Sequence, residues 1–442
     1  MRSAQRTALL PRAGPKPIVI FDRRFRSFDR VVMKMGRWVR SGTAVAVVMV
    51  FVAALLAIVM IQPSGLSRAQ GGWNTNDPTD PTSQLPSATE GSIHWEVGYY
   101  DSDGLKIYGL ICYPKGDPAF PPPYPVLIIN HGLDPTPPHP AILDSALFGC
   151  ITMARAGWLV ATSTYRAETI ENTPLPGWPQ VFGAGFTRTS DFAPAWWWTG
   201  GVEMCGGEVD DVLNLLSAVK ALPMANPNRV LMWGHSHGSC ITERAIERGA
   251  APQIAVSIDG PTDFWTWKDH PFNSVTDPSG QLRHDRSSAY PDNAPGALAK
   301  VRFLRIQGKG DAVVPAEQGC ELAAVLPGSS DYFVNLGDSV LPVEIGPPGT
   351  HWGQGESPLV CVRLPWLTTG QHFPDPRIGG VLGRLPIFLM YSCPESACPQ
   401  GTPTEFEHGE ILVQSWPAFA TFVNHFISGW NASIPAQYVQ LE

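Results

Sequence analysis

The sequence predicts an α/β fold: a mostly parallel central sheet with helices on both faces, preceded by a transmembrane or signal segment. Apolar runs bounded by Gly, Pro or Asn alternate with stretches whose apolar residues recur at helical spacing. Strands that alternate with helices form parallel sheets buried on both faces. The 442 residues are 44% hydrophobic and 16% charged, which suffices for a large core and excludes disorder along the whole chain.

The first expected elements are two short strands at residues 93–100 and 105–113. They are joined by Asp103-Gly104, a residue pair typical of tight hairpin turns. The later strands are short apolar runs that begin after turn-forming residues. They are expected at residues 125–130, 158–163, 229–233, 253–258, 301–306 and 343–345.

Helices are expected between these strands and at the end of the chain. In residues 208–222, Val209, Val212, Leu216 and Val219 recur at the spacing of one helix face. The other expected helices end at residue 156 or cover residues 239–248, 316–326 and 415–430, the last with Ser415 as its N-cap.

The charges are divided unevenly along the chain. Residues 1–40 hold eleven basic residues (Lys or Arg) and two acidic residues (Asp or Glu). The rest of the chain holds 20 basic and 37 acidic residues. A surface that binds nucleic acid needs clustered cations to neutralise phosphates. The acidic body therefore argues against nucleic acid as a partner.

Residues 44–61 form an uncharged apolar run that would span about 27 Å as a helix, close to the thickness of a bilayer core. The basic residues 1–43 should stay cytoplasmic, which places the rest of the chain on the extracytoplasmic side, secreted or membrane-anchored. Ser67-Arg68-Ala69 suits a signal peptidase, so both a cleaved signal and an uncleaved anchor remain open. Translation from Met33 or Met35 would give a signal of ordinary length. Residues 62–92, rich in Pro, Ser, Thr and Asn, are expected to be a flexible linker.

An even number of cysteines follows this linker, and an exported chain permits disulfides among them. Cys393 and Cys398 are the simplest local pair. No CxxC motif occurs, so a zinc ribbon and a thioredoxin motif are not supported, and we expect neither a metal nor a cofactor. The eight cysteines are Cys112, Cys150, Cys205, Cys240, Cys320, Cys361, Cys393 and Cys398.

The candidate nucleophile is Ser236, in the segment Gly234-His235-Ser236-His237-Gly238. This is G-x-S-x-G between an expected strand and an expected helix, the setting in which the motif has a mechanism. The serine occupies a strained turn, and glycine two positions away on each side removes steric clashes. The turn aims helix N–H groups at a developing oxyanion.

A serine hydroxyl needs a general base, which is expected to be a histidine oriented by a carboxylate. Asp311 follows the strand at 301–306, on the edge of the sheet where α/β sites form, and is the expected acid. Asp259 also follows a strand and is the alternative.

His351 is the expected base, because it follows the short strand at 343–345 in a glycine-rich loop. His408, close before the closing helix, remains the alternative. His372 and His425 are interpreted as surface or packing residues.

The turn His131-Gly132 follows another strand and can supply a second oxyanion donor. The expected donors are the backbone N–H groups of His237 and of Gly132 or Leu133. His131, His235 and His237 could suggest a metal site, but His235 and His237 point in different directions and no carboxylates cluster with them.

These segments together resemble the α/β-hydrolase superfamily, and within it the catalytic domain of the prolyl oligopeptidase family and the dienelactone-hydrolase-like esterases. The resemblance implies a catalytic domain over residues 93–442 and triad roles for Ser236, Asp311 and His351. The segments that carry it are 103–109, His131-Gly132, Tyr165-Arg166, Asp210-Asp211, 234–238, 308–315 and 349–351.

The chain departs from these families in three ways. About 90 residues precede the domain, so gating of substrates by the β-propeller of the oligopeptidases is not expected. Ser236 stands where dienelactone hydrolases have cysteine. Residues 356–410 form a long insertion before the closing helix, which keeps His408 in consideration.

The expected function is hydrolysis of carboxylic esters through an acyl-enzyme on Ser236. A peptidase of the oligopeptidase type acting on short peptides is the alternative, and a non-catalytic surface binding protein is a third hypothesis. The insertions at about 167–206 and 261–298 are rich in aromatic residues and leave strand ends on the catalytic face. They are interpreted either as an aromatic wall for a small ester or as a cap with its own core. Arg166 could hold a substrate carboxylate, but a structural salt bridge is favoured.

Overall fold

The computed structural model has two compact units, Met1–Gly65 and Leu66–Glu442, and every described residue belongs to the second. The expected signal or membrane segment at 44–61 lies outside the described residues. Within the described part of the chain, no helix is long and apolar enough to cross a membrane. The structure describes residues 72–76, 84–85, 87–133, 140–141, 143–166, 168–170, 202–267, 281–308, 311, 313–315, 317–326, 330–335, 339–342, 387–392, 408–409, 411–412 and 415–436.

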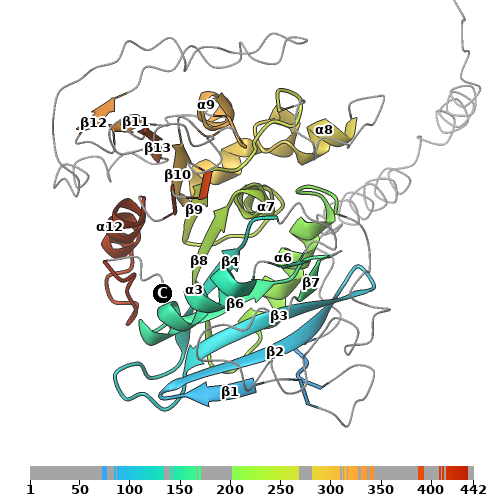
Figure 1. Ribbon diagram of the computed structural model, residues 1–442, viewed down its shortest axis with the longest axis vertical. Helices are drawn as coiled ribbons and strands as arrows, with labels where there is room; N and C mark the ends of the chain where they lie inside the picture. Colours follow the sequence, from blue (N-terminus) through green and yellow to red (C-terminus); the bar gives the residue numbers. More distant parts are fainter. Residues whose placement is uncertain are drawn as a thin grey trace, which may run out of the picture. The chain divides into compact units, whose positions relative to one another are not determined.

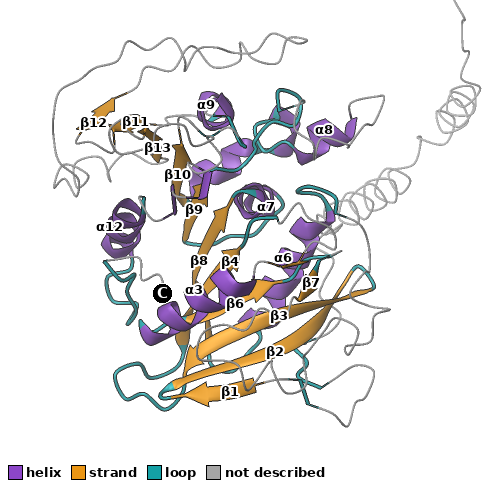
Figure 2. Ribbon diagram, viewed as in Figure 1, coloured by secondary structure: helices purple, strands orange, loops and turns teal. Residues whose placement is uncertain are grey.

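An eleven-stranded sheet forms the centre of this unit (Figures 1 and 2). The six neighbouring pairs from β6 to β11 are all parallel, whereas β1, β2, β3 and β12 pair antiparallel. The expected α/β fold with a mostly parallel sheet is thus confirmed. In spatial order the strands are β1 (Ser87–Glu90), β2 (Ile93–Ser102), β3 (Leu105–Pro114), β6 (Leu159–Ser163), β4 (Tyr124–Asn130), β8 (Ala225–His235), β9 (Ile254–Ile258), β10 (Arg302–Gly308), β13 (Ile387–Ser392), β11 (Ser330–Asn335) and β12 (Ser339–Pro342).

Helices cover both faces of the sheet. Because side chains alternate between the two faces, successive residues of one strand pack against different helices. In β4, Leu127 and Ile129 join the apolar cluster of α3 (Leu143–Arg155) and α12 (Trp416–Phe426), whereas Val126 and Ile128 join that of α6 (Gly207–Lys220) and α7 (His237–Glu247). Helix α9 (Glu317–Val325) packs with β10 and the end of α7. The smaller elements are α8 (Gln281–Arg286), the 3-10 helices η1 (Pro291–Asn293) and η2 (Pro295–Lys300), and a two-stranded sheet of β5 (Pro140–Ala141) and β7 (Thr169–Ile170).

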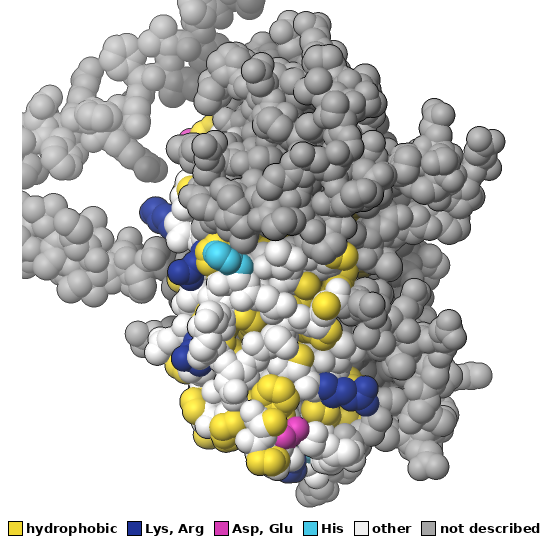
Figure 3. Space-filling view, turned by 90° about the vertical axis from the view of Figure 1, so that its left-hand side faces the viewer, with side chains coloured by type: hydrophobic (Ala, Val, Ile, Leu, Met, Phe, Trp, Pro, Cys, Tyr) yellow, Lys and Arg dark blue, Asp and Glu magenta, His cyan; other side chains and the backbone are white. Residues whose placement is uncertain are grey.

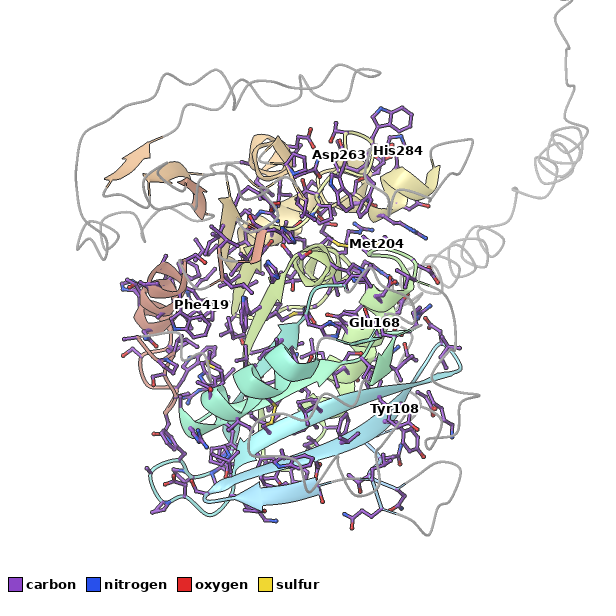
Figure 4. The ribbon with its side chains drawn as sticks, in the orientation of Figure 1. Tyr108, Glu168, Met204, Asp263, His284 and Phe419 are labelled. Atoms are coloured by element: carbon purple, nitrogen blue, oxygen red, sulfur yellow. A yellow bond between two sulfur atoms is a disulfide. The ribbon has the colours of Figure 1, made fainter. Side chains whose placement is uncertain are left out.

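The closing helix α12 is held by aromatic packing. Phe419 stacks on Trp233 of β8 with 5.4 Å between ring centroids, and Trp416 meets the same ring edge-on at 5.8 Å (Figure 4). Ser415 precedes the helix as expected, but its hydroxyl makes no cap hydrogen bond. Burial of the apolar face therefore stabilises this helix more than capping does.

Part of the expected linker belongs to the folded unit. Strand β1 pairs with β2, and Asn74 exchanges backbone hydrogen bonds with Tyr99 at 3.0 and 2.9 Å. The Trp73 ring lies where a Cβ at Gly98 would sit, and its Nε1 donates to Glu96 at 3.0 Å. The missing side chain at Gly98 thus makes room for the indole.

The last parallel strand differs from the expected one. Residues 343–345 lie outside the described residues, and the strand beside β10 is β13. An additional hairpin of β11 and β12 comes between α9 and β13 along the chain and extends the sheet beyond it. The predicted insertion at 356–410 therefore contains a strand of the central sheet.

Two disulfides join buried cysteines of the described residues. Cys112 of β3 is bonded to Cys150 of α3, and Cys205, just before α6, is bonded to Cys240 of α7. Each bond thus ties a helix to another part of the core. The predicted pair Cys393–Cys398 lies outside the described residues.

One face of the molecule is seen in Figure 3. In its described part, hydrophobic side chains are scattered among polar atoms, and the blue Lys and Arg side chains are separate from one another. Basic groups do not gather there as they would on a surface built for phosphates.

A buried ion pair links three elements behind the nucleophile. Arg305 of β10 is fully buried, and its Nη1 donates to Glu243 of α7 at 2.7 Å and to Ser257 of β9 at 2.8 Å. Its Nη2 donates to the backbone oxygen of Gly260 and to Gln307 at 2.5 Å. The charge is therefore compensated on several sides, as a buried cation requires.

Removing this arginine should destabilise the fold strongly. Arg305→Met leaves the Glu243 carboxylate buried without its cation, and we expect the free energy of unfolding to fall by about 3–5 kcal/mol. The partly exposed pair of Arg248 and Asp210 is the matched control, for which Arg248→Met should cost under about 1 kcal/mol. Urea unfolding followed by circular dichroism measures both. Equal losses in the two variants would contradict the importance of the buried pair.

Candidate active site

Ser236 sits in a strained turn between β8 and α7, as the motif predicts. Its φ is 54° and its ψ is −122°, a region that non-glycine residues rarely adopt. A Cβ at Gly234 would overlap the carbonyl of Gly238, and a Cβ at Gly238 would overlap that of Asn130. Gly234 is therefore needed for the close approach of β8 to α7, and Gly238 for the close approach of α7 to β4.

A chain of hydrogen bonds links Ser236 to a carboxylate through a histidine. His408 Nε2 lies 2.8 Å from Ser236 Oγ, and His408 Nδ1 lies 2.6 Å from Asp311 Oδ2. The other oxygen of Asp311 accepts the backbone N–H groups of Val313 and Val314 at 2.8 and 2.9 Å. Asp311 can hold the proton of His408 on Nδ1, which leaves Nε2 free to accept the serine proton.

His408, the alternative, therefore occupies the position between Ser236 and Asp311 in which His351 was expected. His351 lies outside the described residues, as does His372, and the place between Ser236 and Asp311 is filled by His408. Strand β13 precedes His408 along the chain, where no strand was expected from the sequence. His425 packs its ring against Phe426 on α12 at 4.7 Å, in line with its interpretation as a packing residue.

His235, inside the motif, fixes the backbone that carries the base. Its Nε2 lies 2.9 Å from the carbonyl oxygen of His408, to which it donates, and the two rings are 4.9 Å apart. Burial, then the neighbouring His408, lowers the pKa of His235 to about 3, so this ring is neutral at neutral pH. The sequence offered no signal for this contact, because the two residues are far apart along the chain.

The turn expected to hold the oxyanion lies against the nucleophile. A Cβ at Gly132 would be 3.3 Å from Ser236 Cβ, Leu133 follows it, and His237 is the first residue of α7. The ring of His131 braces this turn: its Nε2 lies 2.7 Å from the carbonyl of Ser163. The donor roles of His237, Gly132 and Leu133 remain predictions.

Two groups of possible metal ligands lie near the nucleophile, with the ligand atoms of each group within 4.8 Å of one another. The first is His235, Asp259 and His408, where His408 is engaged by Ser236 and Asp311. In the second, His237 lies between Cys205 and Cys240, which are bonded to each other and offer no thiolate. Neither donor set fits a metal ion.

Comparison with known families supports this chemistry. The model of the Prolyl oligopeptidase family matches residues 189–355, a range that includes Ser236 and Asp311 and ends before His408. The chain is a serine hydrolase, and its residues 189–355 are similar to the prolyl oligopeptidase family. Among curated proteins, no significant match was found.

Solved structures of hydrolases share low similarity with this serine hydrolase. Acetyl xylan esterase from Paenibacillus sp. R4 is 18% identical (TM-score 0.37; 55% of this chain and 79% of that chain covered). Acylaminoacyl peptidase of Pyrococcus horikoshii is 12% identical (TM-score 0.41; 79% of this chain and 43% of that chain covered). Prolyl oligopeptidase B of Galerina marginata is 17% identical (TM-score 0.38; 53% of this chain and 30% of that chain covered). The match thus covers less than half of each peptidase. Because these TM-scores are below 0.5, the likeness carries no argument about the substrate.

Arg166 of this hydrolase is a structural cation. Its Nη2 donates to Asp211 at 2.9 Å and to Asp103 at 3.0 Å, and its Nε donates to Asp211 at 3.1 Å. A guanidinium engaged by two carboxylates has little charge left for a substrate. The favoured interpretation as a structural salt bridge is thus confirmed.

Of the two aromatic insertions, most of the first lies outside the described residues. In the second, Phe264 and Trp267 are buried, meet edge-on at 5.5 Å and belong to the apolar cluster of α6 and α7, so they do not form a separate core. Trp265 is 38% exposed and stacks on His284 at 5.4 Å (Figure 4 labels His284). The second insertion therefore contributes to the core and also presents one open aromatic ring.

Proposed function

We propose that this serine hydrolase cleaves carboxylic esters through an acyl-enzyme on Ser236. One observation carries the proposal: His408 lies within hydrogen-bonding distance of both Ser236 Oγ and Asp311 Oδ2. A serine, a histidine and a buried carboxylate linked in this order form the machinery of acyl transfer. A non-catalytic binding protein would have no need of this arrangement or of a strained turn at Ser236.

In the first half-reaction, Ser236 Oγ attacks the ester carbonyl while His408 Nε2 takes the hydroxyl proton. Asp311 stays ionised and stabilises the imidazolium that forms. The backbone N–H groups of His237 and of Gly132 or Leu133 hold the oxyanion of the tetrahedral intermediate. His408 then gives its proton to the leaving alcohol oxygen, and the C–O bond breaks.

In the second half-reaction, water attacks the acyl-enzyme. His408 takes a proton from the water, and the tetrahedral intermediate collapses to release the carboxylic acid. The proton returns to Ser236 Oγ. Every step uses groups of this chain and water, so the proposed reaction needs no cofactor.

Esters are preferred over peptides in this proposal because an ester carbonyl is more electrophilic than an amide carbonyl and an alkoxide leaves more readily than an amide anion, so ester cleavage asks less of the site. The family match favours the alternative, a peptidase that acts on short peptides. The same triad serves both reactions, and the difference lies in the groups that bind the substrate.

We also propose that the catalytic unit works outside the cytoplasm, secreted or held at the membrane by an uncleaved segment at residues 44–61. The two buried disulfides support this localisation, because disulfides persist mainly in oxidising compartments. Acidic composition beyond residue 40 agrees with a partner other than nucleic acid.

The proposal is tested by labelling and by a substrate panel. A fluorophosphonate should form one adduct, located on Ser236 by peptide mapping. Rates on p-nitrophenyl esters should exceed those on aminoacyl p-nitroanilides under the same conditions. Faster turnover of the anilides would favour the peptidase, and a folded protein that takes no label would overturn the proposed chemistry.

A further inference from the structure

Asp259 is a buried carboxyl beside the triad that the proposed mechanism does not use. It follows β9 directly, is fully buried and accepts the Gly308 N–H on Oδ1 at 2.5 Å. Its Oδ2 receives no hydrogen bond from the described residues. A carboxylate oxygen that is removed from water and has no donor is costly, so this environment disfavours the ionised form.

The groups around Asp259 also disfavour its ionised form. Asp311 is a neighbouring carboxyl: a Cβ at Gly308 would be 3.3 Å from Asp259 Oδ2 and 3.4 Å from Asp311 Cβ. Ligand atoms of His235 and His408 lie within 4.8 Å of the Asp259 carboxyl. Among the described residues, the positive charge of Arg305 favours the ionised form of Asp259. The guanidinium of Arg305 is, however, engaged by Glu243.

Two adjacent buried carboxyls do not both ionise readily. Asp311 already accepts hydrogen bonds from two backbone N–H groups and faces His408 Nδ1. Burial, and then the negative charge of Asp311, raise the pKa of Asp259 well above its usual range. The proton of the pair therefore belongs to Asp259.

We propose that Asp259 is a positioning residue that stays protonated and donates a hydrogen bond from its carboxyl O–H to the Asp311 carboxylate. Asp311 is then held in place for His408, and the site carries one negative charge beside the imidazole. A second negative charge would favour protonated His408, which cannot accept the proton of Ser236. The inference rests on the proposed function, because it acts through the triad.

Two substitutions distinguish the effect of a neutral hydrogen-bond donor at position 259 from the effect of filling the space with an apolar side chain. Asp259→Asn keeps the shape, a neutral group and an N–H donor, and Asn tolerates the φ of 48° found here. Asp259→Leu keeps the branching and the number of side-chain heavy atoms and removes the donor. We expect kcat for ester hydrolysis within about threefold of wild type for the Asn variant. For the Leu variant we expect a loss of about 10- to 100-fold in kcat with KM unchanged.

The matched control is Asp263→Asn. Asp263 is another buried carboxyl after β9, but it accepts the Trp265 N–H at 2.8 Å and is not part of the triad. Its substitution should leave kcat unchanged. The wild type should also lose kcat/KM at alkaline pH as Asp259 ionises, and Asp259→Asn should lack this fall.

A readout independent of activity is the infrared band of a protonated carboxyl group at pH 7, which should be lost from the spectrum of Asp259→Asn. If the Asn variant is as slow as the Leu variant, or if no such band is lost, the inference is wrong. Should Leu prevent folding, the Asn kinetics and the infrared band still decide. If the wild type hydrolyses neither esters nor anilides, the proposed function fails, while the infrared band still tests the protonation of Asp259.

Discussion

Replacing Ser236 by alanine should abolish hydrolysis while leaving the fold intact. Without Oγ, His408 has no nucleophile to deprotonate, and we expect kcat to fall by about 10⁴- to 10⁶-fold. Alanine adopts the positive φ of this turn at a cost similar to that of serine, and the backbone bond from residue 236 to Ile258 at 2.8 Å remains. Stability in urea should therefore change little. Steady-state kinetics on the best ester, together with fluorophosphonate labelling, measure the effect.

The control for this variant is Ser92→Ala, in which an exposed serine loses a long contact of 3.4 Å to Asp117. This variant should keep full activity and full labelling. Hydrolysis near the wild-type rate in Ser236→Ala would refute the nucleophile assignment. A label that moves to another residue in that variant would point to a second reactive site.

Much of the fold follows from local sequence. Asp103 and Gly104 both have positive φ, 52° and 79°, as a tight hairpin turn requires, and β2 and β3 pair on either side of them. The strand before Ser236 and the helix after it are specified by the glycines of the motif and by apolar periodicity. The nucleophile and Asp311 could therefore be placed from the sequence.

The base could not be placed in the same way, because its position depends on a distant strand. Residues 387–392 read Ile-Phe-Leu-Met-Tyr-Ser, an apolar run of the length and kind expected of a buried strand. They pair in parallel with both β10 and β11. Reading this run as the last strand would have favoured His408, which follows it and precedes α12.

The supporting contacts around the triad were also beyond the sequence. His235 was assigned no partner, yet it donates to the backbone of His408, which is 173 residues away. Asp259 was weighed as an alternative acid, and its carboxyl is instead a buried neighbour of Asp311. Both roles arise because β8, β9 and β10 end at the same edge of the sheet, where residues remote in sequence become neighbours.

The second large effect is expected at the base. His408→Ala removes the proton acceptor of Ser236 and the partner of Asp311, and kcat should fall by about 10³- to 10⁵-fold. His351→Ala should keep kcat within about threefold of wild type. Because the substitution leaves space beside Ser236, added imidazole should restore part of the activity of His408→Ala. Kinetics on one ester with and without imidazole measure all three effects.

His425→Ala serves as the matched control, since this exposed histidine of α12 packs on Phe426 away from the triad. It should behave as the wild type does. A full loss of activity in His351→Ala, with His408→Ala still active, would reverse the assignment of the base. Loss in both variants would mean that the chain near residue 351 also supports the site, and imidazole rescue of one variant alone would then identify the proton acceptor.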